Sequence, residues 1–371
     1  MSVDTNLPIS RLTAHLPRHD LRQMMRLVRL LFRLSQSKLY RNQIFPQLPD
    51  VAQFDPGHAA LMMGYDFHLT ANGPRLIEVN TNAGGGYIAW LSEQLAGKAS
   101  PLYLSKRFQQ RLLQSYLQEW HDFSGGERPL KRVAVVDEDV EQQPLLPEMV
   151  GCCDWLSQYG IDAQVASLEE LQVQHDGVYL QGKIVDLIYN RHCDFYLEAA
   201  LMAELKSAYL GGLVCLSPNP FAYGLLADKR RMILWSDAAA LDSLELSFQD
   251  RALLLEMVPS SVLLSGQNRD DIWSRRKKLI LKPVTRFGSR GVLMGKGITK
   301  KRFADLDPET TLVQQVVAPS VETTEDDQEF KMDLRLFVYR NHLIGVGARL
   351  YQGQVTNLRT EGGGFAPVRI V

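Results

Sequence analysis

Between residues 130 and 218, short apolar runs alternate with segments long enough to form helices. The apolar runs cover residues 133–137, 161–165, 185–189 and 213–216, and the helical segments cover residues 147–159 and 198–210. Neighbouring parallel strands need a crossover of about a dozen residues or more, which is usually a helix. The alternation therefore predicts a small parallel sheet flanked by helices, and so an α/β protein. Because no GxGxxG follows the first run, we do not expect a dinucleotide-binding fold.

The length and charge of the chain bound its domain number and its partners. The 371 residues predict two domains, or a closely fused pair, at about 100–200 residues per domain. A composition of 45% hydrophobic and 22% charged residues is that of a globular protein and excludes a disordered, collagenous or disulfide-scaffold chain. Lys and Arg number 41 against 42 Asp and Glu, whereas a nucleic-acid binder usually has a clear basic excess. We therefore expect no nucleic-acid partner.

The spacing of the cysteines and the absence of long apolar stretches indicate in which cellular compartment we expect the protein. Cys152 and Cys153 are adjacent, and Cys193 and Cys215 stand alone, so neither a CxxC zinc motif nor a disulfide framework is present. The first twenty residues lack the apolar core of a signal peptide. No stretch approaches the ~18 uninterrupted apolar residues of a membrane span. We expect a cytoplasmic protein with no membrane span.

Residues 20–40 have the period of an amphipathic helix, with Asp20 as the expected N-cap. The apolar residues recur three and four apart, at Leu21, Met24, Met25, Val28, Leu31 and Leu34. The other face carries Arg22, Arg26, Arg29 and Arg33. A basic amphipathic helix can dock on an anionic membrane, but a helix packed on the core with a solvated basic face is the favoured interpretation.

Residues 64–80 change to the period of a strand. Polar and apolar residues alternate up to the turn residues Asn72-Gly73-Pro74, after which a second strand follows. If the strands pair around this turn, Asp66 stands opposite Glu78, and Asn80 shares the face of Glu78. Opposed carboxylates repel unless a cation joins them, and oxygen ligands suit Mg²⁺. The hairpin therefore predicts a metal site at Asp66, Glu78 and Asn80; the alternative is an ordinary exposed polar face.

Two lysines and a glycine loop indicate a phosphate site. Lys282 lies in the apolar run 279–283, and the loop RFGSRG follows at residues 286–291. A lysine on a strand can neutralise phosphate while the backbone N–H groups of such a loop cover it. Lys229 lies early in another expected helix, residues 225–234. No Walker A motif or protein-kinase triplet is present, and a solvated lysine beside an ordinary turn is the alternative.

The order of these pieces along the chain resembles the ATP-grasp superfamily. After the lysines and the glycine loop come LVQQVV at 312–317, DLRLFVYRNHLIGVGAR at 333–349 and NLRTEGGG at 357–364. The resemblance implies ATP as a cofactor. Its expected binding residues are Lys229, Lys282, Gly288, Ser289, Gly291, Gln314, Gln315 and Val317. The resemblance also implies that Arg349 is the catalytic arginine and that Asn357 binds substrate.

The position of one motif resembles a permuted branch of that superfamily. An ordinary ATP-grasp chain ends with an acidic strand and an ExN motif, whereas IEVNTNAGG stands here at residues 77–85. This order resembles the circularly permuted glutathionylspermidine synthase-like group, and it implies Mg²⁺ on Asp66, Glu78 and Asn80. It further implies an ATP-grasp fold in permuted order, with a small parallel-sheet pre-ATP-grasp-like domain and an N-terminal helical segment. The expected divisions are a helical segment at 1–60, a metal-binding part at 61–122, the pre-ATP-grasp-like domain at 130–218 and the nucleotide-binding part at 219–371.

The activity implied by the resemblance is ATP-dependent ligation of a carboxylate to an amine through an acylphosphate, on a peptide-like or polyamine substrate. Gly84 and Gly85 would admit a substrate backbone, and Arg191 would bind a substrate carboxylate; a simple turn and a structural salt bridge are the alternatives. Gly64 stands where those synthases have an arginine, and no amidase domain is present, so glutathione and spermidine are not implied as substrates. The competing class is a non-catalytic nucleotide-binding or assembly protein on the same fold.

Overall fold

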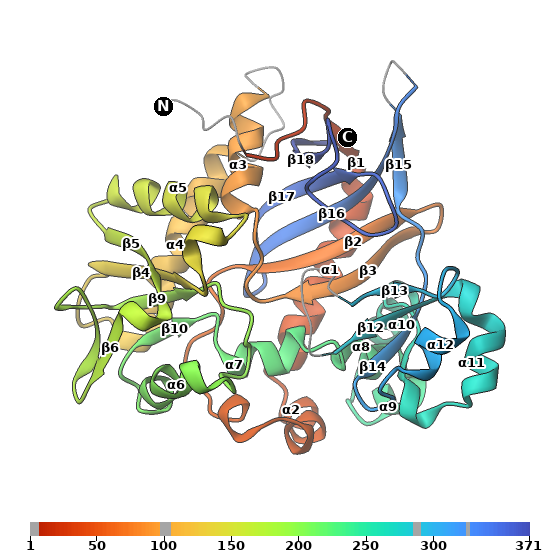
Figure 1. The fold of residues 1–371 in the computed structure, drawn as a ribbon, viewed down its shortest axis with the longest axis horizontal. Helices are drawn as coiled ribbons and strands as arrows, with labels where there is room; N and C mark the ends of the chain where they lie inside the picture. Colours follow the sequence, from red (N-terminus) through yellow and green to blue (C-terminus); the bar gives the residue numbers. More distant parts are fainter. Residues whose placement is uncertain (1–6, 97–104, 285–290, 324–326) are drawn as a thin grey trace.

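The computed structural model describes residues 7–96, 105–284, 291–323 and 327–371. Figure 1 shows a mixed α/β molecule in which three larger sheets are surrounded by helices. The α/β class predicted from the sequence is therefore confirmed. Within the described ranges, no helix combines the length and the apolar character needed to cross a membrane.

The largest sheet joins two parts of the chain that lie far apart in sequence. Its strands are β2 (Met63–Thr70), β3 (Gly73–Asn80), β15 (Ser320–Thr323), β16 (Glu329–Tyr339), β17 (His342–Tyr351) and β18 (Gly364–Ala366). The predicted pair is confirmed, because Asp66 on β2 lies opposite Glu78 on β3, although the register shifts by one residue between Asp66 and Phe67. β2 also pairs antiparallel with β16, where Arg335 lies directly opposite Asp66. The early hairpin and the late strands therefore form one continuous sheet.

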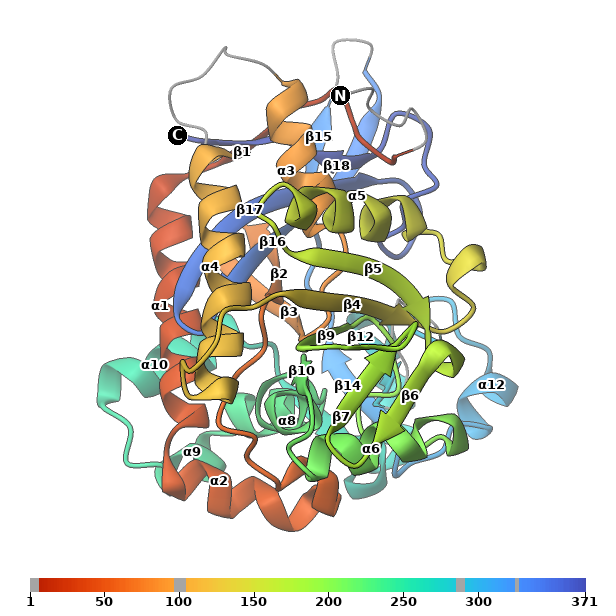
Figure 2. The same cartoon turned by 90° about the vertical axis from the view of Figure 1, so that its left-hand side faces the viewer.

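Helices cover both faces of this six-stranded sheet (Figures 1 and 2). On one face, α1 (Arg18–Ser35) and α10 (Phe248–Met257) contact β3. On the other face, α3 (Gly86–Leu95) and α4 (Ser105–Ser124) contact β17. Side chains of a strand alternate between its faces, so Leu336 packs into the first core and its neighbour Phe337 into the second.

The N-terminal segment forms two helices where one was predicted. α1 ends at Ser35, and α2 (Lys38–Ile44) begins after a two-residue break. Asp20 is not the N-cap, because the helix already begins at Arg18 and Asp20 lies buried in its first turn. The apolar face of α1 packs into the core, as the favoured interpretation expects. The exposed face carries Arg22, Arg26, Arg29 and Arg33.

A strand near the start of the described chain pairs with its last strand beside this helix. The short strand β1 (Ala14–Leu16), which precedes α1, pairs in parallel with β19 (Val368–Ile370). The backbone N–H of Arg18 donates to the carbonyl of Val371 at 2.7 Å, so the pairing continues to the start of the helix. The N-terminal segment is thereby attached to the last strands of the chain.

The predicted parallel sheet is present, in the order β10-β9-β4-β5, and all its pairs are parallel. It contains β4 (Arg132–Asp137), β5 (Asp162–Ser167), β9 (Leu187–Asn190) and β10 (Cys215–Ser217), with α5 (Leu146–Ser157) and α6 (Ala203–Leu210) between them. Sequence reasoning missed a small antiparallel sheet inserted before β9, formed by β6 (Leu171–Gln174), β7 (Gly177–Leu180) and β8 (Lys183–Ile184). Strands this short do not display a clear period.

A second four-stranded sheet carries the predicted lysine strand. Its order is β11-β14-β12-β13, with β11 (Ser261–Leu263), β12 (Leu279–Pro283), β13 (Leu293–Met294) and β14 (Thr311–Gln315). Two short helices, α11 (Arg269–Arg275) and α12 (Lys300–Ala304), pack on it through Ile272 and Phe303. These side chains belong to a small hydrophobic core that is separate from the cores of the largest sheet.

The helix predicted at residues 225–234 is broken at Lys229. A π-helical turn, η6 (Tyr223–Ala227), ends before Asp228, and α8 (Arg231–Ser236) begins two residues after Lys229. The buried carboxylate of Asp228 accepts hydrogen bonds from Tyr196 Oη at 2.6 Å and from the backbone N–H of Arg230 at 2.9 Å. These bonds stabilise a turn, so Lys229 projects from a turn and not from within a helix.

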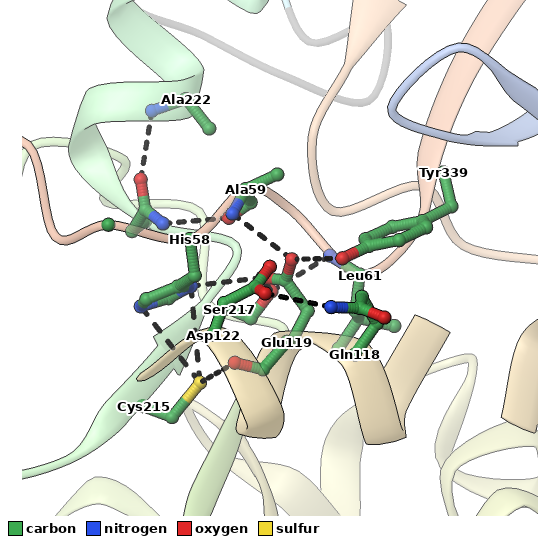
Figure 3. Close-up of polar contacts among 12 residues, drawn as sticks. His58, Ala59, Leu61, Gln118, Glu119, Asp122, Cys215, Ser217, Ala222 and Tyr339 are labelled. Carbon is green, nitrogen blue, oxygen red and sulfur yellow. Dashed lines mark hydrogen bonds and ion pairs between the residues drawn. The ribbon is translucent and has the colours of Figure 1, made fainter. Parts of the chain in front are cut away.

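A fully buried carboxylate joins four parts of the chain (Figure 3). Glu119, on α4, accepts hydrogen bonds from His58 Nδ1 at 2.9 Å and from the backbone N–H of Ala59 at 3.0 Å. It also accepts from Ser217 Oγ and Tyr339 Oη, each at 2.9 Å. Ser217 ends β10 and Tyr339 ends β16, so Glu119 ties the parallel sheet to the six-stranded sheet.

Candidate functional site

The hairpin β2–β3 brings the three predicted metal ligands together. Asp66 and Glu78 are paired across the strands, and Asn80 lies two residues further along β3 on the same face. The Nδ2 atom of Asn80 donates to Glu78 Oε1 at 3.2 Å and to Asp66 Oδ2 at 3.4 Å. Two carboxylates and an amide oxygen are a donor set that suits a hard cation such as Mg²⁺. No group of three or more His, Cys, Asp or Glu placed to hold a metal is found in the described ranges.

Asp66 is held by two arginines that the sequence did not pair with it. Arg335 Nε and Nη2 donate to the two oxygens of Asp66, both at 2.6 Å, and Arg349 Nη2 donates to Oδ2 at 2.8 Å. Burial would by itself raise the pKa of the Asp66 carboxyl, but the charges and hydrogen bonds of both arginines hold that pKa well below its ordinary value. Asp66 is therefore a buried anion.

Arg349, the predicted catalytic residue, bridges two carboxylates. Besides Asp66, its Nε atom donates to Oδ1 of Asp333 at 2.6 Å. Asp333 Oδ2 accepts from Thr356 Oγ1, also at 2.6 Å. Asp333 and Arg349 are directly paired on β16 and β17, which explains how the sheet register sets this contact. The guanidinium is thus fixed beside the hairpin carboxylates from the neighbouring strands.

Lys282 and Lys229 lie on the other side of Glu78. Both lysines line one small cavity together with Glu78 and Gln314. Lys282 is only 5% exposed, and its Nζ atom donates to Gln314 Oε1 at 2.7 Å and to the carbonyl of Ile77 at 3.2 Å. Burial, aided by the charge of Lys229, lowers the pKa of Lys282 to about 8 against the opposing pull of Glu78 and Asp66.

His68 is a site residue that sequence reasoning missed. It follows Asp66 by two positions on β2, so its side chain lies on the same face of the sheet. Its Nδ1 atom donates to the carbonyl of Val317 at 2.8 Å, in the linker between β14 and β15. Burial lowers the pKa of His68, so the ring is neutral near pH 7. The alternation of side chains along β2 could have identified His68, because it places every second residue on the face of Asp66.

The linker beside His68 forms one wall of an open cleft of about 840 Å³. Gln315 and Val317, two predicted nucleotide-binding residues, line this cleft, whereas Gln314 faces the cavity of the lysines. The opposite wall comes from the end of α10 and the segment after it, residues 255–260. Successive residues of β14 point to opposite faces, which explains why Gln314 and Gln315 face different spaces.

The glycines of the turn before α3 are packed against the protein itself. A Cβ atom on Gly84 would lie 2.6 Å from Leu145 Cδ1 and 2.9 Å from Arg191 Nη2. Gly85 has a φ of +90°, and a Cβ there would overlap the ring of Phe365. The carboxylate of Glu148 accepts from the backbone N–H of Gly85 at 2.8 Å. Close packing therefore accounts for glycine at both positions without a substrate.

Arg191 stabilises the same turn. Its Nη1 atom donates to the carbonyl of Asn82 at 2.8 Å and to Tyr189 Oη at 3.2 Å. Asn82 returns a hydrogen bond from Nδ2 to the carbonyl of Arg191 at 3.1 Å. The C-terminal end of β9 is thereby joined to the segment that follows Asn80.

The remaining predicted site residues lie elsewhere. Gly288 and Ser289 fall outside the described residues, and Gly291 occupies a turn just before β13 with a φ of +75°. Asn357 Nδ2 donates to the carbonyl of Gln352 at 2.8 Å, so its side chain stabilises its own loop. The structure thus places Asp66, Glu78, Asn80, Arg349 and Lys282 around one hairpin, whereas the hydrogen bonds of the Asn357 side chain stay within its own loop.

Comparison with solved structures places the fold. A glutathione synthetase-like effector from Globodera pallida, in its apo form, matches with a TM-score of 0.62 at 11% identity, over 98% of this chain and 90% of that chain. A putative gamma-glutamylcysteine synthetase from Methylobacillus flagellatus matches with a TM-score of 0.52 at 11% identity, over 94% of this chain and 87% of that chain. The ATP-grasp ligase PsnB, complexed with a minimal precursor, Mg and ADP, reaches a TM-score of only 0.31 at 13% identity, over 64% of this chain and 88% of that chain. No protein-family model and no curated protein matches the sequence.

These likenesses define a class of fold. The chain shares its mixed α/β fold with a glutathione synthetase-like effector and a putative gamma-glutamylcysteine synthetase. At 11% identity this statement concerns the fold alone.

Proposed function

We propose that the protein is an ATP-dependent ligase that joins a carboxylate to an amine. The observation that carries the proposal is the arrangement around one hairpin of an ATP-grasp-like fold. On one side of Glu78 two lysines line a cavity, and on the other side Asp66 lies against Arg349. Cations for phosphate and oxygen donors for a metal are thereby adjacent, which is what phosphoryl transfer requires.

The lysines and the linker would hold the nucleotide. Lys229 and Lys282 would bind its phosphates, and Gln315 and Val317 line a cleft large enough for the base and sugar. Lys282 would exchange its hydrogen bond with Gln314 for a phosphate oxygen. Gln314 would stay in place through its own bond from Nε2 to Ser261 Oγ, at 3.1 Å.

The hairpin side chains would hold Mg²⁺. Asp66, Glu78 and Asn80 are the donor set, and their mutual contacts show that their polar atoms converge. A magnesium ion supplies neutralisation of phosphate charge and fixes the geometry of the phosphate chain. The buried position of Asp66 keeps it anionic and so ready to act as a ligand.

The reaction then needs positioning and charge stabilisation from the protein. A carboxylate oxygen of the first substrate attacks the γ-phosphorus, the bond from that phosphorus to its bridging oxygen breaks, and ADP leaves. The amine nitrogen of the second substrate attacks the acyl carbon, loses a proton, and phosphate leaves with its oxygen. Arg349 would stabilise the negative charge on the transferred phosphoryl group, because Asp333 holds its guanidinium beside the hairpin.

The domain division and the substrates belong to the same proposal. We place the ATP-grasp unit in residues 61–122 and 219–371, with a pre-ATP-grasp-like domain at 130–218 and a helical segment at 1–60, in a circularly permuted order. Support comes from the sheet that unites β2 and β3 with β16 and β17. We propose a peptide-like or polyamine substrate, and the names of the two structural neighbours, a glutathione synthetase-like effector and a putative gamma-glutamylcysteine synthetase, support the peptide-like choice.

The test is ADP release by the full chain with pairs of carboxylate and amine substrates, at saturating Mg-ATP. We expect turnover that depends on both substrates and is lost in Glu78→Ala. Glu138→Ala, which changes an exposed acid in the bend after β4, is the matched control and should keep its activity. Full activity of Glu78→Ala would remove Glu78 from the metal site.

One observation favours a second candidate, a nucleotide-binding protein without turnover. Asp66 and the carbonyl of Val317 are already hydrogen-bonded by side chains of the protein. Calorimetric binding of Mg-ATP without ADP release on any substrate pair would favour this candidate over the ligase.

A further inference from the structure

Arg335 occupies a central place that neither the motif order nor the proposed roles explain. It is 7% exposed and stands directly across from Asp66 in the pairing of β16 with β2. Its Nε and Nη2 atoms bind both oxygens of Asp66, and Nη1 donates to the carbonyl of Gly84 at 2.9 Å. One side chain therefore links the hairpin carboxylate to the turn that begins α3.

Gly64 leaves the space through which Arg335 reaches these partners. A Cβ atom on Gly64 would lie 3.2 Å from both Cδ and Nε of Arg335, and 2.6 Å from the Cβ atom of Ala83. In the sheet, Gly64 pairs with Phe337, two residues from Arg335 on the same strand. The glycine two residues before Asp66 and the arginine across the sheet are thus spatially coupled.

Arg349 binds the same carboxylate differently. A carboxylate offers about four lone-pair positions, two on each oxygen. Arg335 takes one position on each oxygen, and Arg349 takes the second position on Oδ2 through a single hydrogen bond. The Nδ2 atom of Asn80 approaches the same Oδ2 at 3.4 Å, so this oxygen faces the other metal donors. Oδ1 keeps a free lone pair, but a cation shared with Asn80 and Glu78 would approach Oδ2, where it would compete with Arg349.

We propose that Arg335 is a positioning residue that holds Asp66 in place throughout, whereas Arg349 occupies the coordination position on Oδ2 until a cation replaces it. Cation binding and the release of Arg349 from Asp66 are then coupled. Arg349 remains attached to Asp333 after its release, so it stays beside the transferring phosphoryl group. This inference rests on the proposed function, because it assigns Asp66 as a metal ligand.

The coupling predicts opposite effects of two arginine substitutions on metal affinity. Binding of Mn²⁺ to the nucleotide-free full chain is measured by electron paramagnetic resonance, with Tm recorded for each variant. We expect Arg349→Met to bind Mn²⁺ several-fold more tightly than the wild type, because a competitor is removed. We expect Arg335→Lys to bind it about tenfold more weakly, because a point charge cannot hold both oxygens and the carbonyl of Gly84 together. Arg340→Met, which removes an ion pair with Asp122 beyond the end of β16, should match the wild type.

The opposite signs separate this inference from a general loss of structure, which would weaken binding in both variants. Equal weakening in Arg349→Met and Arg335→Lys overturns the coupling, as does Mn²⁺ affinity in either variant that matches the wild type. If Arg335→Lys does not fold, the Mn²⁺ affinity of Arg349→Met alone tests the coupling, because only competition between Arg349 and the cation predicts an increase. The ADP-release assay is scored separately, so turnover with unchanged Mn²⁺ affinities removes only the inference. Tighter Mn²⁺ binding in Arg349→Met without any wild-type turnover removes only the ligase assignment.

Discussion

The Nζ atom of Lys282 donates a 2.7 Å hydrogen bond to Oε1 of Gln314 inside a cavity that Glu78 also lines. Lys282 is thus buried with the neutral side chain of Gln314 as its hydrogen-bond partner. A lysine in this setting is easier to deprotonate than one in water, because burial penalises its charged form. The same burial strengthens its attraction for a phosphate that enters the cavity.

The first prediction concerns the pH dependence of nucleotide binding. Since the pKa of Lys282 is lowered from 10.5 to about 8, the affinity for ADP should fall as the pH rises above about 8. Calorimetric titration of ADP between pH 7 and 9.5 measures this. Lys282→Arg keeps its charge throughout this range and should flatten the profile. An ADP affinity in the wild type that stays constant to pH 9.5 would falsify the role of Lys282.

The first prediction has a second part, because the stability of the free protein should change with pH in the opposite direction. The unfolded chain binds a proton at Lys282 more tightly than the folded chain, because the folded pKa lies below the ordinary value. The free energy of unfolding contributed by this group therefore rises as the pH increases from about 8 toward 10.5. Urea unfolding of the wild type and of Lys282→Met across this range isolates the contribution.

Local patterns made the hairpin and the parallel sheet predictable. The turn at Asn72 and the period of two placed Asp66 opposite Glu78, as the structure has them. The pairs nearer the turn, such as Thr70 with Gly73, are offset by one residue, and a register shift between Asp66 and Phe67 that the sequence did not indicate restores the predicted pair. The strands of the parallel sheet were predictable because each lies in a continuous apolar run, and the segments between these runs are long enough for crossover helices. The break at Lys229 was not predictable, because the acceptor at Asp228 is satisfied by Tyr196, 32 residues away in sequence.

The contacts that define the candidate site could not be predicted from a single sequence, because they also join residues that lie far apart along the chain. Arg335 and Asp66 are separated by 269 positions, and neither residue has a local signal that names the other. The glycines at 84 and 85 show the converse case. Their sequence suggested an open backbone, whereas the neighbouring rings and side chains fill the space beside them. A glycine can be required either because a ligand approaches the backbone or because a neighbouring side chain does, and only the tertiary packing distinguishes the two cases.

The second prediction tests how Arg349 is held. Asp333→Asn keeps the shape of the side chain but weakens its charge-assisted bond to Arg349 Nε. The guanidinium would then lack a charged anchor once a cation has displaced it from Asp66, and kcat should fall by up to about 100-fold while KM for ATP changes little. Thr356→Val, which removes the other hydrogen bond to Asp333, should have a smaller effect in the same direction. An Asp333→Asn enzyme with a normal kcat would exclude this positioning role.

The third prediction concerns stability and the buried carboxylate of Figure 3. Both carboxylate oxygens of Glu119 accept hydrogen bonds. In Glu119→Gln one of these oxygens becomes an NH₂ group, whose N–H donors would face the donors of the neighbouring residues. The free energy of unfolding should fall by about 3 kcal/mol or more. Tyr339→Phe removes one of the donors and should cost about 1 kcal/mol. Urea unfolding measures both values, and an equal loss in the two variants would contradict a central role for Glu119.

The last prediction uses the bond from His68 to the linker. His68 Nδ1 donates a hydrogen bond to the carbonyl of Val317. Val317 lines the cleft that we propose for the nucleotide base. His68→Phe leaves that carbonyl without its donor, and an unsatisfied carbonyl costs about 1–3 kcal/mol until a ligand donates to it. A base with an exocyclic amino group can do so, whereas a base with a carbonyl at that position cannot. His68→Phe should therefore bind ATP about tenfold more tightly than the wild type and leave ITP affinity unchanged. Equal gains for ATP and ITP in calorimetric titrations would show that the Val317 carbonyl does not meet the base.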